Sequence, residues 1–251
     1  MIEIDLTGRN ALITGGTRGI GRVISRRLAE AGANTIAVYR GDASSAQASL
    51  AEREAVDGIG WHRNLQADIG DEAAVERLIG DIQETVPDGL DILVLNAAIG
   101  LHGKITETDP AQWRRLFDVN LGSAFLLTRG LIPVLHRGGS IVAIGSGAGH
   151  DPIPGLALYG AVKAGLNMFI ADLAQEAGPL GIRANVVSPG STDNTFFGNA
   201  PSPRESQDAA SHNALRRHGL PDDVAGVVLF FCSDLSGFVT GQAIRVNGGA
   251  I

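Results

Sequence analysis

Short apolar runs alternate with longer stretches of helical periodicity along this chain. Most of the runs are rich in β-branched residues and are bounded by Gly, Asp or Asn, as strands are. They cover residues 10–14, 35–39, 62–66, 92–95, 140–144, 183–187 and 243–246. Helical spacing predicts helices over residues 20–31, 72–85, 110–135, 157–177 and 221–233. The alternation predicts a doubly wound parallel α/β sheet of the Rossmann type, with helices on both faces.

Length and composition indicate a single domain. The chain has 251 residues, α/β folds often run to about 250 residues undivided, and no change of composition marks a boundary. We therefore expect residues 1–251 to form one domain. Two segments look like loops: residues 41–49 are rich in small polar residues, and residues 189–219 are too long for an ordinary connection. Because long loops often carry function, residues 189–219 are predicted to be a substrate lid.

Charge and cysteine usage exclude several classes of protein. The chain has 27 acidic and 20 basic residues, and its net charge of −7 disfavours nucleic acid as a partner. Cys232 is the only cysteine, so no internal disulfide or cysteine-based zinc site can form, and we predict no metal. Residues 1–5 are acidic, unlike a signal peptide. Residues 227–232, the most apolar stretch, are far shorter than the about 20 residues of a membrane span. We expect a cytoplasmic protein without a membrane partner.

A glycine-rich segment follows the first predicted strand and leads into a helix. Residues 14–21 read Thr-Gly-Gly-Thr-Arg-Gly-Ile-Gly. Glycines let the backbone approach a ligand closely, and free N–H groups at a helix start attract a pyrophosphate. The spacing differs from the common G-x-G-x-x-G, so a turn kept tight only for packing is the alternative. A loop that binds nucleoside triphosphates would need Lys and Ser or Thr where Arg22 and Val23 stand.

The end of the second predicted strand bears on the choice of dinucleotide. An acidic residue there would bind the 2′-hydroxyl of the adenosine ribose, whereas arginine favours a 2′-phosphate. The strand ends at Tyr39 and is followed by Arg40, and the first acidic residue is Asp42. Arg18 of the glycine turn could reach the same phosphate. Both arginines could instead be solvated surface charges. Their coincidence favours NADP(H) over NAD(H).

Ser146, Tyr159 and Lys163 form a candidate catalytic set. Tyr159 and Lys163 are four residues apart in a helical pattern, so they share a face. A tyrosine that exchanges a proton near neutral pH needs a pKa below its usual value of about 10, and a neighbouring ammonium or a positively charged nicotinamide could lower it. Ser146 follows a strand end, where α/β sheets bind ligands, and could hold a carbonyl oxygen.

Each of these signals is weak alone, since exposed Tyr and Lys often occur at this spacing. The serine could also indicate a hydrolase, but Ile144 and Ala148 occupy the glycine positions of the G-x-S-x-G turn. No histidine lies in a recognisable triad or zinc motif. His62 falls in a strand and is interpreted as structural. Four others are interpreted as loop or surface residues: His102, His136, His150 and His218.

In this order the motifs resemble those of the short-chain dehydrogenase/reductase family over essentially the full length of the chain. The matching positions are residues 14–21, Asp68, Ile69, Asn96, Ala97, Ala98, Asn120, Ser146, Tyr159, Lys163, Pro189, Gly190 and residues 246–249. The resemblance implies that Tyr159 is the general acid in ketone reduction and that Lys163 lowers its pKa and binds the nicotinamide ribose. Ser146 would orient the carbonyl, and Asn120 would hold a water that links Lys163 to bulk solvent.

The resemblance also implies which residues contact the cofactor. From the glycine turn they are Gly15, Thr17, Arg18, Gly19, Ile20 and Gly21, with Arg40 beyond the second strand. The others are Asp68 and Ile69 at the adenine, Asn96, Ala97 and Ala98 beside the nucleotide, and Pro189, Gly190 and Thr192 at the nicotinamide, besides Tyr159 and Lys163.

Some of these residues have another possible role, and some positions depart from the usual sequence of the family. Asp68 could cap the helix that begins near Asp71, Asn120 could be a buried amide bonded to backbone, and Pro189 with Gly190 could form only a turn. Residues 95–98 read Leu-Asn-Ala-Ala where the family usually has Asn-Asn-Ala-Gly. Three neighbours compete with Thr192 for its role: Ser191, Asn194 and Thr195.

Within the family the sequence is most similar in character to bacterial 3-oxoacyl-thioester reductases and polyketide ketoreductases. This implies an NADP(H)-dependent oxidoreductase that interconverts a ketone and a secondary alcohol, with a 3-oxoacyl thioester, a polyketide or another small or cyclic ketone as substrate. Members that use a carrier protein dock it with two arginines. Arg137 stands at one position and Leu180 at the other, which weakens a carrier-protein substrate. The lid offers Phe196 and Phe197 as apolar contacts, and Arg204, Arg216 and Arg217 as anion contacts.

Two other functions remain open: an NAD-dependent alcohol dehydrogenase of the same fold, and a nucleotide-binding regulatory relative without catalysis. The complete set of Asn120, Ser146, Tyr159 and Lys163 argues against the second. The resemblance further implies a homo-oligomer, a tetramer built from residues 110–135, residues 157–177 and the last strand.

Overall fold

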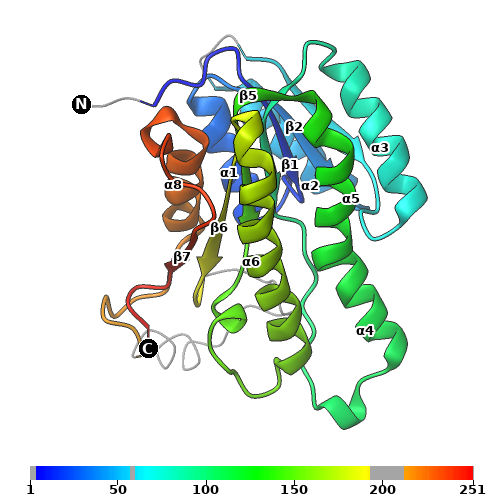
Figure 1. The fold of residues 1–251 in the computed structure, drawn as a ribbon, viewed down its shortest axis with the longest axis vertical. Helices are drawn as coiled ribbons and strands as arrows, with labels where there is room; N and C mark the ends of the chain where they lie inside the picture. Colours follow the sequence, from blue (N-terminus) through cyan, green and yellow to red (C-terminus); the bar gives the residue numbers. More distant parts are fainter. Residues whose placement is uncertain (1–3, 57–59, 193–211, 251) are drawn as a thin grey trace.

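The computed structural model describes residues 4–56, 60–192 and 212–250. Its centre is one sheet of seven parallel strands in the order β3-β2-β1-β4-β5-β6-β7 (Figure 1). The strands are β1 (Asn10–Thr14), β2 (Asn34–Tyr39), β3 (His62–Gln66), β4 (Leu90–Leu95), β5 (Leu135–Ile144), β6 (Arg183–Pro189) and β7 (Ala243–Val246). The strand order reverses between β1 and β4. In open α/β sheets the carboxyl ends of the strands at such a reversal form the ligand-binding crevice.

Helices cover both faces of this sheet. They are α1 (Gly19–Glu30), α2 (Ala43–Glu54), α3 (Glu72–Thr85), α4 (Pro110–Phe117), α5 (Ser123–Leu131), α6 (Ala157–Ala177) and α8 (Pro221–Cys232). Figure 1 shows α1 and α8 on one side of the molecule and α3 and α5 on the other. No described helix combines the length and the apolar character that a membrane span requires.

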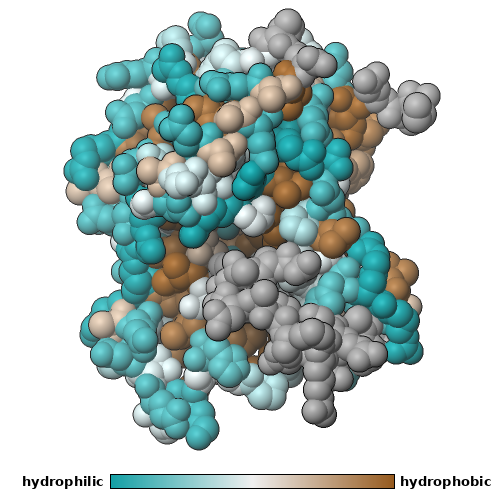
Figure 2. All heavy atoms as spheres, turned by 180° about the vertical axis from the view of Figure 1, so that it is seen from behind, coloured by the Kyte–Doolittle hydropathy of each residue, from teal (hydrophilic) through white to brown (hydrophobic). Residues whose placement is uncertain are grey.

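Two apolar cores flank the sheet, because successive side chains of a strand point to opposite faces. In β1, Leu12 belongs to the core under α3, α5 and α6, and Ile13 belongs to the core under α1 and α8. Both side chains are fully buried. The near-continuous apolar strands therefore reflect burial on two faces, as the sequence predicted. Seen from behind, the surface is hollowed across its middle, and apolar residues line the hollow (Figure 2).

The seven predicted strands are confirmed, but β5 begins earlier than expected. It starts at Leu135 rather than Ser140, and Leu135 pairs with Leu90 of β4. The register shifts between this pair and the next. Gly138, with φ +90°, and Gly139 lie in this irregular part of the strand. In a sequence, two consecutive glycines indicate a turn, so the first half of this strand was not predicted.

The prediction of a loop over residues 41–49 is wrong, because α2 begins at Ala43. The Asp42 side chain caps this helix by accepting from the backbone N–H of Ser45. The buried residues of α2 are Ala46, Ser49 and Arg53. Small and polar residues on the buried face leave no apolar periodicity for the sequence to reveal.

The prediction of one continuous helix over residues 110–135 is also wrong. A wider π turn, Asp118–Gly122, separates α4 from α5, and a short 3₁₀ turn precedes β5. The side-chain amide of Asn120 donates to the carbonyl of Leu116 at 2.8 Å, the acceptor that its own backbone N–H would use in an α-helix. Pro133 then ends the helical stretch, since it has no N–H to donate.

Only the two ends of the predicted lid are described. They meet where Thr192 pairs with Gly219 and the backbone N–H of Gly219 donates to the carbonyl of Ser191 at 3.0 Å. Five residues named for the lid or for the nicotinamide lie outside the described residues: Asn194, Thr195, Phe196, Phe197 and Arg204. Arg217, at the described end, forms an ion pair with Asp223 rather than standing open to an anion.

Candidate active site

A cavity of about 1030 Å³ lies at the carboxyl ends of the strands, around the reversal between β1 and β4. It brings together every residue that the sequence predicted at the cofactor, together with Ser146. The predicted residues are Gly15, Thr17, Arg18, Gly19, Ile20, Gly21, Arg40, Asp68, Ile69, Asn96, Ala97, Ala98, Tyr159, Lys163, Pro189, Gly190 and Thr192. Asn120 is not in the lining and lies behind it, on the π turn. Residues distant in sequence thus form one continuous site.

The glycine turn is shaped by contacts that exclude side chains. At Gly21, a Cβ atom would overlap the carbonyl of Gly15 and the amide of Asn96. Gly19 has φ +51°, and a Cβ there would meet no protein atom within 4 Å. Since Gly19 also begins α1 and lines the cavity, the start of this helix is open to a ligand. This arrangement suits the pyrophosphate of a dinucleotide.

Asn96 ties the end of β4 to the glycine turn. Its side-chain amide donates to the carbonyls of Thr14, at 2.8 Å, and Gly15, at 3.1 Å. Its backbone N–H donates to the hydroxyl of Thr14 at 2.9 Å. These bonds fix the floor of the cavity. They do not involve Leu95, so the departure from the family pattern at that position leaves them in place.

Ser146, Tyr159 and Lys163 meet at the other end of the cavity. Ser146 follows β5 and caps a short turn, whereas Tyr159 and Lys163 are one turn apart on α6. The hydroxyls of Tyr159 and Ser146 share a hydrogen bond. Lys163 Nζ donates to the carbonyl of Ile144 at 2.8 Å and lies 5.9 Å from the centre of the Tyr159 ring. Strand β5 and helix α6 therefore hold all three groups together.

Burial shifts the pKa values of Tyr159 and Lys163 in opposite directions. It raises the pKa of Tyr159 to about 12, which the hydrogen bond from Ser146 only partly offsets. Burial lowers the pKa of Lys163 to about 8. Desolvation of the phenolate causes this increase, so Tyr159 is neutral at pH 7, and the expected effect of Lys163 on its pKa stays a prediction. A neutral phenol in this position is a proton donor.

Within the described residues, only the nitrogen of the Asn120 side-chain amide is hydrogen-bonded to the protein. Its amide group donates to the carbonyls of Leu116 and Ile99, at 2.8 and 3.1 Å, as the alternative interpretation of a backbone-bonded amide expects. Its oxygen, Oδ1, is buried and has no hydrogen-bond partner within the described part of the chain. A buried acceptor left in this way usually binds water or has a functional role.

Charged groups concentrate at the opposite end of the cavity, beyond β2 and β3. Arg115 of α4 donates to both carboxylate oxygens of Asp68, at 2.6 and 2.7 Å. Although burial acts to raise it, the pKa of Asp68 is lowered by the hydrogen bonds from Arg115 and the Gly70 backbone. Asp68 does not cap α3, since Asp71 does. No sequence pattern indicated Arg115, because its partner is 47 residues away.

Pro189 and Gly190 do more than form a turn. The backbone N–H of Gly190 donates to the carbonyl of Val246 at 2.9 Å, and a Cβ at Gly190 would lie 2.7 Å from the Cβ of Asn247. The end of β6 is thereby pressed against the last strand and the loop that follows it. Thr192 donates back to the Gly190 carbonyl at 3.2 Å.

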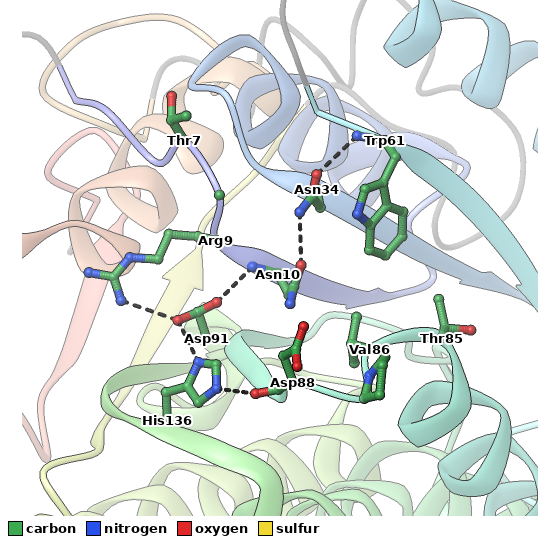
Figure 3. Close-up of a pocket in the computed structure, with 12 residues that line it drawn as sticks. Thr7, Arg9, Asn10, Asn34, Trp61, Thr85, Val86, Asp88, Asp91 and His136 are labelled. Atoms are coloured by element: carbon green, nitrogen blue, oxygen red, sulfur yellow. Dashed lines mark hydrogen bonds and ion pairs between the residues drawn. The ribbon is translucent and has the colours of Figure 1, made fainter.

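A second cavity, of about 540 Å³, lies at the amino ends of β1 and β4 (Figure 3). Its centre is the buried carboxylate of Asp91. Asp91 accepts from Arg9 at 3.2 Å, from the backbone N–H of Asn10 at 2.8 Å and from His136 at 3.0 Å. The other ring nitrogen of His136 contacts the carbonyl of Asp88. These groups are paired with one another.

The structure also revises the histidine interpretations. His62 is structural as expected, with its Nδ1 2.9 Å from the hydroxyl of Thr35. His136 is half exposed but holds Asp91 rather than standing free. His150 lies in a turn, as the loop interpretation expects, but it is half-buried, with Nε2 2.9 Å from the hydroxyl of Ser188 and 3.2 Å from Asn167 Nδ2.

Comparisons with known proteins agree with this fold. A family model described as Enoyl-(Acyl carrier protein) reductase matches residues 15–250. The 3-oxoacyl-[acyl-carrier-protein] reductase FabG of Aquifex aeolicus is 37% identical, over 99% of both chains. A short-chain dehydrogenase of Burkholderia cenocepacia, solved in complex with NADP, superposes with a TM-score of 0.91 at 35% identity, covering 97% of this chain and 98% of the other.

A further structural neighbour is the reductase LugOII, which catalyses keto-reduction at C1 in lugdunomycin biosynthesis. It superposes with a TM-score of 0.90 at 32% identity, covering 97% of this chain and 98% of the other. The fold and the cavity define a dinucleotide-binding α/β oxidoreductase. The chain belongs to the short-chain dehydrogenase/reductase family.

Proposed function

We propose that this protein reduces a ketone to a secondary alcohol with NADPH, and catalyses the reverse reaction with NADP⁺. The observation that carries the proposal is the hydrogen bond between the hydroxyls of Ser146 and Tyr159, with Lys163 beside it, in the cavity that the glycine turn also lines. NADPH, when bound, supplies the hydride that adds to the carbonyl carbon. The protein supplies the binding, the orientation and the proton.

The residues present fit such a cofactor. The open start of α1 suits the pyrophosphate, and Arg18 and Arg40 at the end of β2 favour a 2′-phosphate. Asp68 and Ile69 line the part of the cavity that suits the adenine, and Pro189, Gly190 and Thr192 line the part near Tyr159 that suits the nicotinamide. The NADP complex of the Burkholderia relative supports the same choice of cofactor.

Each catalytic side chain has a distinct task in the proposed reaction. Ser146 and Tyr159 donate hydrogen bonds to the substrate carbonyl oxygen, which gains negative charge as the carbon is reduced. Tyr159, neutral because of its burial, transfers its proton to that oxygen. The Lys163 ammonium stabilises the phenolate that remains. Asn120 offers its buried Oδ1 to a water through which the proton is replaced.

A small ketone or a 3-oxoacyl thioester is the proposed substrate class. FabG of Aquifex aeolicus is named as a 3-oxoacyl-[acyl-carrier-protein] reductase, and LugOII catalyses a keto-reduction at C1 in lugdunomycin biosynthesis. Both relatives support the class. Leu180 is half exposed and lies close to Arg137, whose side chain packs over Gly181. An apolar residue where a second arginine is expected favours a substrate that no carrier protein delivers.

We also propose that the protein is a single-domain cytoplasmic enzyme that assembles as a homotetramer. Large apolar side chains are exposed on the elements expected to pair, including Phe125 of α5 and Met168 of α6. Phe238, before the edge strand β7, is fully exposed, and Ile244 of β7 is partly so. Light scattering tests this proposal, and a monomer at micromolar concentration would contradict it.

Replacing Tyr159 with phenylalanine tests the catalytic assignment. We expect Tyr159→Phe to lose ketone-dependent consumption of NADPH by about 10²–10⁴-fold, since the general acid is gone. NADPH binding, followed by fluorescence, should be retained because the ring remains. Equal turnover by the two proteins across a panel of 3-oxoacyl thioesters and cyclic ketones would overturn the assignment.

A further inference from the structure

Asp42 lies where a 2′-phosphate-binding site needs positive charge. It lines the same cavity as Arg18 and Arg40, and its carboxylate is 3.6 Å from the Arg18 guanidinium. Among the described charged residues that line this end, three are arginines (18, 40 and 115) and two are aspartates (42 and 68), so the net charge is 3 − 2 = +1. Asp68 offsets the charge of Arg115, and Asp42 offsets one of the two charges that Arg18 and Arg40 would supply to a phosphate.

The carboxylate of Asp42 cannot easily leave this position. One oxygen accepts from the backbone N–H of Ser45 at 3.0 Å, and the other accepts from the Ser45 hydroxyl at 2.7 Å. These bonds make it the cap of α2 and lower its pKa, so it stays ionised at neutral pH. Arg18, by contrast, is largely exposed, and Asp42 is its ion-pair partner. The anion is held by two hydrogen bonds, whereas the cation lies mostly in solvent.

We propose that Asp42 is a specificity-determining residue that weakens the preference of this enzyme for NADPH over NADH. Its carboxylate competes with the 2′-phosphate for Arg18 and repels that phosphate directly. In NADH the ribose carries a neutral hydroxyl at this position, so the Asp42 carboxylate does not repel it. The inference rests on the proposed use of NADP(H). It adds that the affinities for NADPH and NADH differ less than they would if Arg18 and Arg40 acted without Asp42.

The alternative is that Asp42 serves only as a helix cap, and Asp71 offers a matched control. Asp71 caps α3 in the same way, by accepting from the backbone N–H of Ala74 at 2.7 Å, but it does not line the cavity. Asparagine is about as good a cap as aspartate, so Asp42→Asn and Asp71→Asn should both fold with nearly unchanged stability. They differ only in where the charge is removed.

Calorimetric titrations separate the two interpretations. The ligands are NADPH, NADH, and the pair adenosine 2′,5′-bisphosphate and adenosine 5′-monophosphate, which differ only in the 2′-phosphate. We expect Asp42→Asn to bind NADPH and the bisphosphate about three- to tenfold more tightly, the range that removing one nearby charge gives in a solvated site. NADH and the monophosphate should change by less than about twofold, and Asp71→Asn should change none of the four. The gain should shrink at about 0.5 M salt, because exposed charges are screened.

Three outcomes would overturn the inference. They are an unchanged affinity of Asp42→Asn for NADPH, an equal change for NADPH and NADH, or the same change in Asp71→Asn. If the unaltered chain bound neither dinucleotide, the proposed function would fail together with the inference. Binding of both dinucleotides without a selective gain would leave the proposed function intact and remove only the role of Asp42.

Discussion

The two ends of the sheet each hold a cluster of polar side chains, and the clusters differ in how they are satisfied. At the amino ends of the strands, the Asp91 carboxylate accepts three hydrogen bonds, and both nitrogens of His136 contact acceptors of the protein (Figure 3). At the carboxyl ends, Asn120 keeps a buried oxygen with no partner among the described residues. Lys163 is buried, no carboxylate in the described part of the chain pairs with it, and its pKa falls to about 8.

This difference separates a stabilising cluster from a functional one. Buried polar groups that pair with one another hold elements together, whereas buried groups left unpaired or uncompensated cost free energy. Such a cost persists where a ligand or a reaction uses the group. The amino-end cluster should therefore stabilise the fold without affecting catalysis, and the carboxyl-end cluster should serve catalysis at a cost in stability.

Removing the centre of the amino-end cluster should have the largest effect on stability. Asp91→Ala leaves the N–H of Asn10 without its acceptor and leaves Arg9, among the described residues, only the exposed carboxylate of Asp234, at 3.8 Å, which should lower the free energy of unfolding by about 2 kcal/mol. Activity per folded molecule should not change, because the site is at the other end of the sheet. Denaturant unfolding and steady-state kinetics at a temperature where both proteins are folded would measure the two effects.

Asp88 offers the control for this prediction. It lines the same cavity, but its side chain is exposed. Asp88→Ala should therefore change the stability by no more than about 0.5 kcal/mol. A loss of turnover in folded Asp91→Ala would contradict the assignment of this end to stability alone.

Lys163 should show the opposite behaviour. Lys163→Met removes a buried charge, so the free energy of unfolding at pH 7 should rise, while turnover should fall by about 10²-fold or more as the charge beside the phenol is lost. The folded pKa, about 8, lies below the unfolded value of about 10.4. The unfolded state then binds more protons at this lysine between these values, so Lys163 contributes a rise in stability with pH across that window.

In Lys163→Met this rise should be absent. In thermal unfolding between pH 7 and pH 10, the stability of the variant relative to the unaltered protein should therefore fall as the pH rises. A variant that is both less stable and fully active at pH 7 would reverse the assignment of the two ends.

The sequence predicted the residues at the carboxyl ends of the strands but not those at the amino ends. The carboxyl-end residues were found because glycine turns and the Tyr159–Lys163 spacing are local patterns with a chemical meaning. The amino-end cluster was missed, since Arg9, Asp91 and His136 come together only through the pairing of β1, β4 and β5. Arg115 was missed for the same reason, because its ion pair with Asp68 exists only once α4 packs beside β3's carboxyl end.

The errors in secondary structure have a common physical origin. Strands were found because β-branched residues buried on two faces give a strong signal. Helix α2 buries small and polar residues, and the π turn depends on one side-chain hydrogen bond from Asn120, so neither has an apolar period. The burial that raises the Tyr159 pKa could not be predicted, because the sequence shows the neighbouring lysine but not the packing around the phenol.

The smallest effect is expected from His136, whose charge stabilises the amino-end cluster. Hydrogen bonds to Asp91 and to the Asp88 carbonyl raise its pKa above the ordinary value. Because the folded pKa is the higher one, this stabilisation is complete below about pH 6.5 and is lost as the pH rises through the folded value. The His136→Gln variant should be less stable by about 1 kcal/mol or less at pH 5.5, since the ring is partly in water, and the difference should fade above neutrality. Urea unfolding of both proteins at pH 5.5 and pH 8.5 measures this, and a difference that grew with pH would mean that His136 is neutral in the fold and that Arg9 alone compensates Asp91.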